Sequence, residues 1–147
     1  MKLLALVLIF GLNCVAHAGY TEAAAALKGV DGKMSNDLDG YLAQPGEVLA
    51  RSEKATALLA DNQQALDLFR QAAAAASDGY LLAPKTDKPT SNTPAPQYGP
   101  HFKLLKLALL DAKVKAARGQ RAQAEADLLA AAGLLEHFAA QKSFMVL

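Results

Sequence analysis

The chain has 147 residues, with 15 lysine and arginine residues against 14 aspartate and glutamate residues, and 52% of it is hydrophobic without any tryptophan. This length is enough for one domain, and the even charge argues against nucleic-acid binding, which needs a strongly basic surface. Alanine supplies much of the hydrophobic fraction. That favours closely packed helices over strands, because strands prefer β-branched and aromatic residues.

Residues 1–18 have the pattern of a secretory signal peptide. Lys2 precedes an apolar run from Leu3 to Leu12, and residues 16–18 form a small-x-small cleavage site. The run is shorter than the ~20 apolar residues that cross a bilayer, so we expect no stable membrane anchor after cleavage. Lipid attachment at Cys14 is disfavoured, because Asn13 stands where a small residue is expected. We therefore predict a periplasmic or secreted protein, whose single domain would be residues 19–147.

The first part of this domain is rich in glycine. A short helix is predicted from Ala23 to Leu27, with Thr21 as its capping residue. Gly29, Gly32 and Gly40 predict turns, since glycine punctuates regular structure.

Residues 47–77 predict a first helical hairpin. Its helices are expected at Glu47–Ala60 and from Gln63 to Ser77. Ala65, Phe69 and Ala72 recur at helical spacing in the second of these, which predicts that they share a buried face.

Residues 101–140 predict a second hairpin, with helices Phe102–Ala117 and Arg121–Ala139 joined at Gly119. Gly119 suits the left-handed conformation that often ends a helix. The first helix carries apolar residues on two faces, so we expect it to be packed from both sides. One face has Phe102, Leu105, Leu109, Ala112 and Ala116, and the other has Leu107, Leu110 and Val114.

The second helix of this hairpin has one predicted buried face. It consists of Ala124, Leu128, Ala131, Leu135 and Phe138, again at helical spacing. Arg121 and Glu125 lie four residues apart and are expected to form an ion pair on its surface.

A proline-rich connector, residues 78–100, separates the two hairpins and contains five of the six prolines of the chain. Prolines at this density argue against regular structure, so we expect an extended connector or, alternatively, a binding loop. Residues 141–147 end in an apolar tail that either docks into a groove or precedes a further helix.

The alanine, large apolar and alanine positions of each second helix resemble those in the second helix of a tetratricopeptide-type repeat. They are Ala65, Phe69 and Ala72 in one unit and Ala124, Leu128 and Ala131 in the other. The resemblance implies an all-α fold in which antiparallel hairpins stack as a short tetratricopeptide-like bundle, and it implies binding of a protein or peptide partner. From residue 45 onwards the chain also resembles exported bacterial helical proteins.

No sequence motif for catalysis, a cofactor or a metal stands out. The chain has no glycine-rich phosphate loop, no G-x-S-x-G and no H-E-x-x-H. His101 and His137 fall at one end of the second hairpin, but a zinc site needs a third or fourth ligand of defined geometry. We therefore expect no enzymatic activity, no cofactor and no metal.

The sequence favours an exported helical module for protein–protein interaction or scaffolding. The face with Leu107, Leu110 and Val114 is the predicted partner-binding surface, if no further helix covers it. The alternative is a small-ligand-binding or enzymatic domain. Its pocket would lie under the 78–100 loop and would be lined by Tyr80, Tyr98 and His101.

Overall fold

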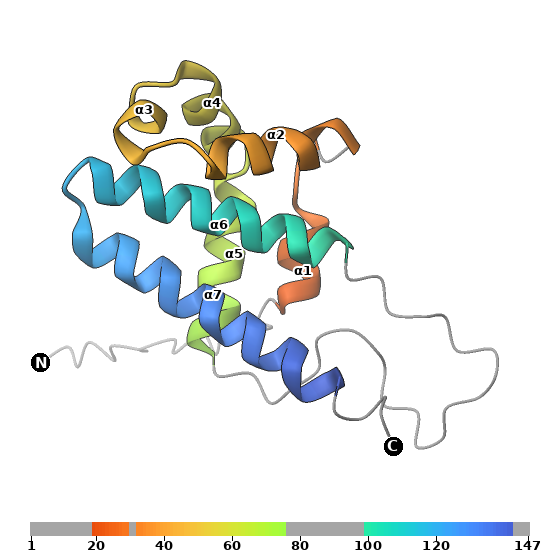
Figure 1. Cartoon of the computed structure of the whole chain (residues 1–147). Helices are drawn as coiled ribbons and strands as arrows, with labels where there is room; N and C mark the ends of the chain where they lie inside the picture. The colour runs from red at the N-terminus through yellow and green to blue at the C-terminus, as the bar shows by residue number, and fades with distance from the viewer. Residues whose placement is uncertain (1–18, 30–31, 76–98, 143–147) are drawn as a thin grey trace, which may run out of the picture.

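The computed structural model describes residues 19–29, 32–75 and 99–142. The predicted signal peptide, most of the 78–100 connector and the last five residues of the tail lie outside this range. The described part is all helical, without a strand, as the sequence predicts (Figure 1). Its helices are α1 (Tyr20–Ala25), α2 (Gly32–Leu42), α3 (Gly46–Ala50), α4 (Glu53–Asp61), α5 (Gln63–Ala74), α6 (Gly99–Ala117) and α7 (Arg121–Lys142).

Helix α6 is the centre of the fold, because α1, α2, α3, α5 and α7 all contact it (Figure 1). Leu104, Leu107 and Leu110 on this helix are fully buried. The prediction that this helix packs from both sides is confirmed. Its first predicted face is buried less completely, since Phe102 near the helix start remains 43% exposed.

The turn between α6 and α7 follows the predicted glycine. Gly119 has a φ of 79°, in the left-handed region. The backbone N–H of Gly119 donates to the carbonyl of Ala116 at 3.0 Å, and that of Gln120 donates to the carbonyl of Lys115 at 2.9 Å. This pair of bonds is the Schellman motif, which satisfies the last carbonyls of α6 and reverses the chain. Helix α7 then packs back along α6 (Figure 1).

Helix α5 packs mainly against α1. Ala65, Phe69 and Ala72 are all buried, so the predicted buried face of this helix is confirmed. The ring of Tyr20 from α1 lies over Phe69, with ring centroids 5.8 Å apart. The two alanines leave room for the tyrosine, and the tilted ring pair adds to the burial energy.

The glycine-rich region forms a helix that the sequence reading missed. Helix α2 begins at Gly32 and runs through Gly40, where a turn was predicted, and the prediction of a turn at Gly40 was wrong. The tertiary contacts of α2 outweigh its low helix propensity. Leu38 is buried in the core, and Lys106 of α6 forms an ion pair with Asp39 at 2.7 Å. Only the predicted turn with Gly29, whose φ is 68°, is confirmed.

The start of the first helix also differs from its prediction. Helix α1 already includes Thr21, and its N-cap position is Gly19, without a side-chain capping bond. The burial of Tyr20 explains the earlier start, because a helical Tyr20 places its ring in the core.

The predicted helix at 47–60 is divided into α3 and α4. Ser52 interrupts it and caps α4, with its hydroxyl oxygen accepting from the N–H of Ala55 at 3.2 Å. Asn62, fully buried between α4 and α5, fixes this region to the segment that follows α1. Its side-chain oxygen accepts from the N–H of Lys28 at 2.7 Å, and its side-chain amide donates to the carbonyl of Leu58 at 3.0 Å.

Candidate functional site

The residues that the sequence pointed to for partner binding lie inside the molecule. Leu107, Leu110 and Val114 are 0%, 0% and 2% exposed. The prediction depended on this face of α6 being uncovered, and the surrounding helices cover it. A partner surface therefore has to be sought on another helix.

Most of the alternative pocket lies outside the described part of the chain. Tyr80 and Tyr98 lie outside the described residues, and His101 is buried with its ring edge-on to Phe138, at a centroid distance of 6.3 Å. His137 belongs to α7, and its side chain lies outside the described part. Within the described segments, no group of three or more His, Cys, Asp or Glu side chains is arranged to hold a metal ion.

Helix α7 faces the core in a different register from the predicted one. Ala124, Ala131 and Phe138 are buried as predicted, but Leu128 is 50% exposed and Leu135 is 48% exposed. The prediction that these two leucines are buried was wrong. The positions that turn inward in their place are those of Asp127 and Leu134, which are 2% and 0% exposed. The registers of α5 and α7, which looked alike in the sequence, are therefore not equivalent.

A cluster of charged side chains, joining α5, α6 and α7, explains this register. Arg70 of α5 binds Asp127 through Nε at 2.6 Å and Asp111 of α6 through a terminal nitrogen at 2.5 Å. Lys115 of α6 binds the same two carboxylates, at 2.7 Å to Asp127 and 2.8 Å to Asp111. Asp67, which is largely exposed, adds a further bond to Arg70 at 2.8 Å. We call Arg70, Asp111, Lys115 and Asp127 the Arg70 cluster.

The Arg70 cluster favours the charged forms of Arg70 and Asp127. Burial by itself raises the pKa of Asp127, but hydrogen bonds from Arg70 and Lys115 and their positive charges outweigh it and lower the pKa overall. Burial likewise opposes the charge of Arg70, and the bond to Asp127 with the nearby carboxylates raises its pKa overall. The two cations balance two buried carboxylates. The cluster is therefore internally neutralised, and neither Arg70 nor Asp127 is suited to proton transfer near neutral pH.

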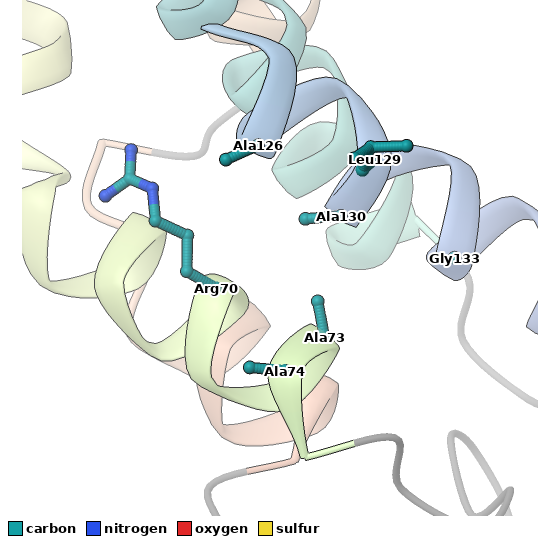
Figure 2. A pocket seen from close by; sticks show the side chains of 7 residues that line it. All are labelled: Arg70, Ala73, Ala74, Ala126, Leu129, Ala130 and Gly133. Atoms are coloured by element: carbon teal, nitrogen blue, oxygen red, sulfur yellow. The ribbon is translucent and has the colours of Figure 1, made fainter. Parts of the chain in front are cut away.

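An apolar groove lies between α5 and α7, beside this cluster (Figure 2). Its volume is about 440 Å³, and small side chains from both helices face it across the gap in Figure 2. The lining residues are Arg70, Ala73, Ala74, Ala126, Leu129, Ala130 and Gly133. Because the Arg70 guanidinium is already bound to three carboxylates, it gives the groove little capacity for an anionic group.

A second groove lies on the other side of α7. It has a volume of about 320 Å³ and lies among α2, α6 and α7, with Leu42, Leu109 and Leu128 in its lining. Between the two grooves the outer face of α7 forms an apolar ridge. We define the α7 ridge as Leu128, Leu129, Ala132 and Leu135, all of them exposed. Leu129, at 68%, is the most exposed of its three leucines.

The sequence analysis missed the α7 ridge, because it did not recognise that Asp127 turns inward. The sequence does contain a signal for this inward turn. It has an aspartate among apolar residues at helical spacing, and arginine and lysine on other apolar faces. It does not say which pair meets, since Arg70 and Asp127 are 57 positions apart.

Comparisons of the chain with protein-family models, with curated proteins and with solved structures find no match. In the described segments, no helix combines the length and the hydropathy needed to span a membrane.

Proposed function

We propose that this chain is an exported helical module for protein–protein interaction, without catalytic activity, and that it binds its partner through the α7 ridge. The observation that carries this proposal is the clustering of exposed leucines. Among the described residues, five large hydrophobic side chains are strongly exposed, and three of them, Leu128, Leu129 and Leu135, lie on one face of α7. Apolar surface gathered in this way, rather than scattered singly, is typical of an interaction site.

The shape of this face suits another helix. A helix packs by placing its ridges of side chains into grooves on its partner. The α7 ridge has a groove on each side, one bordered by Leu129 and the other by Leu128. Covering the exposed part of each leucine would contribute roughly 1 kcal/mol. Three such contacts supply a useful part of a micromolar affinity, which corresponds to about 8 kcal/mol.

The groove between α5 and α7 supports a second candidate, a small apolar ligand. Its volume of about 440 Å³ falls in the range of ligand pockets. Leu135 belongs to the ridge and does not line this groove, whereas Ala74 lines the groove and lies on α5. Leu135→Ser should therefore weaken helix binding and leave ligand binding unchanged, whereas Ala74→Leu, which fills the groove, should weaken ligand binding.

Site-specific crosslinking tests the proposed function directly. A photoreactive residue at position 129 should give a discrete protein adduct in the producing cells, because that side chain points away from its own core. A photoreactive residue at Ala60, an exposed position on α4, is the matched control. If position 129 gives no adduct beyond those seen from position 60, the proposal fails.

Export is the part of the proposal that rests on residues 1–18 alone. We expect the chain isolated from the envelope or the medium to begin at Gly19, which its intact mass would show. A chain that keeps Met1 and stays in the cytoplasm would contradict export and would leave the α7 ridge untouched.

A further inference from the structure

The exposed face of α7 has the spacing of a coiled-coil seam. Its positions recur at alternating steps of four and three residues, which is the 3.5-residue repeat that lets two helices stay in contact over several turns. We define the α7 seam as Arg121, Glu125, Leu128, Ala132, Leu135 and Ala139, all of them exposed. Such a seam runs along nearly the whole helix, which at 22 residues is about 33 Å long.

We propose that the α7 seam pairs with the α7 seam of a second copy of this chain, antiparallel, to form a two-fold symmetric dimer. This inference rests on the proposed function and names its partner. Helix α7 is available for such pairing, because within the described part its main contacts are with α5 and α6 only, on its other face.

The sizes of the seam residues fit an antiparallel pair. If the two-fold axis passes midway between Leu128 and Ala132, the Leu128 of each copy faces the Ala132 of the other. A large side chain then meets a small one at both central levels, which lets the two helices approach closely. The two Leu129 side chains lie next to the axis on one side of the seam and would cover each other.

The charges at the two ends of α7 select the antiparallel direction. Arg121 stands at the start of the exposed face and Glu136 near its end, and neither forms an ion pair with another described residue. In the antiparallel pair Arg121 of one copy lies within one helical turn of Glu136 of the other, at both ends. A parallel pair would instead place like charges at the same level, which is unfavourable. Glu125 lies at nearly the same level as Glu136 of the other copy, but Arg121 lies within one helical turn of both carboxylates. The antiparallel direction is therefore the less repulsive of the two.

The interface has the size of a reversible dimer. A face about 33 Å long and roughly 10 Å wide amounts to about 660 Å² over the two copies, below the ~1,000 Å² of stable specific interfaces and in the range of weak, transient ones. We therefore expect a dimer that dissociates at micromolar concentrations.

Sedimentation of the chain, as isolated from the producing cells, between about 1 μM and 500 μM tests the dimer. We expect a concentration-dependent monomer–dimer equilibrium. Leu129→Glu should weaken it roughly a hundredfold or more, because it places two carboxylates beside the axis. Val48→Glu is the matched control, because Val48 is 51% exposed on α3, away from α7. A thermal unfolding curve for each variant confirms that the fold is kept.

Charge reversal tests the direction. Arg121→Glu should weaken the dimer about tenfold, since it removes the cation from two symmetric ion pairs and leaves three carboxylates at each end of the seam. Adding Glu136→Arg to this variant should restore the dimer, and Arg51→Glu, at an exposed position outside α7, should have no effect. A dimer weakened by Leu129→Glu but not restored in the double variant would overturn the antiparallel arrangement.

The remaining outcomes separate this inference from the proposed function. A chain that stays monomeric throughout, or a dimer as sensitive to Val48→Glu as to Leu129→Glu, overturns the α7 dimer. If position 129 then crosslinks to a different protein, the proposed function stands and only the second copy is excluded. If position 129 crosslinks to nothing, both proposals fail.

Discussion

Replacing Asp127 by alanine tests whether the Arg70 cluster fixes the register of α7. The Asp127 side chain is 3% exposed and binds two cations, Arg70 at 2.6 Å and Lys115 at 2.7 Å. Asp127→Ala removes the acceptor but leaves both cations in place, partly buried beside a small cavity. The substitution should therefore destabilise the native state through unpaired charge rather than through lost apolar packing.

The size of the stability loss depends on which interactions Arg70 and Lys115 keep in the Asp127→Ala variant. Removing one partner of a fully buried ion pair costs about 3 to 5 kcal/mol. Here Arg70 and Lys115 are 27% and 20% exposed, and both still bind Asp111. Water and Asp111 offset part of the loss, so we expect the free energy of unfolding to fall by about 2 kcal/mol.

Urea denaturation followed by circular dichroism measures this change, with an unchanged m-value as evidence that the transition stays comparable. Asp67→Ala is the matched control, since Asp67 binds the same arginine at 2.8 Å but its side chain is 55% exposed. That variant should lose about 0.5 kcal/mol or less. If the two substitutions cost the same, the cluster does not hold α7, and our account of its register is refuted.

Three further predictions concern the pH dependence of stability, the buried Asn62 and two glycines. Lowering the pH from about 5 to 2.5 should destabilise the native state, because the pKa of Asp127 is lowered in the folded chain, whereas the unfolded chain takes up this proton near pH 4. Asp127→Asn should flatten the pH dependence of the urea midpoint. An unaltered slope in that variant would count against the role of Asp127. Asn62→Ala should cost about 2 kcal/mol in the same assay, since it removes the hydrogen bonds of a fully buried side chain to Lys28 and Leu58. A loss within error of zero would contradict that role. Gly119→Ala should lower the free energy of unfolding by about 1 kcal/mol, because position 119 has a positive φ. Gly40→Ala should raise it by about 0.5 kcal/mol, because position 40 lies in a helix and the added Cβ meets nothing within 4 Å. Equal effects would argue against the described turn.

The helical hairpin at the end of the chain was predictable because its signals are local. The period of the apolar residues in α6 and the single glycine at position 119 fix two helices and the turn between them without reference to the rest of the chain. The all-α class followed from the same kind of signal. Helix α2 was not predictable in this way, since Gly32 and Gly40 disfavour a helix locally and only the docking of Leu38 and Asp39 onto α6 favours it.

The surface of α7 could not be derived from α7 alone. An alanine- and leucine-rich helix offers several faces of similar hydrophobicity, so periodicity chose one that includes Leu128 and Leu135. The actual choice depends on Arg70, which lies on another helix and needs an acceptor for its charge. Turning Asp127 inward supplies that acceptor, and the same rotation turns the two leucines outward. The ridge that we propose as the binding site is therefore a consequence of how two buried carboxylates neutralise one partly buried arginine.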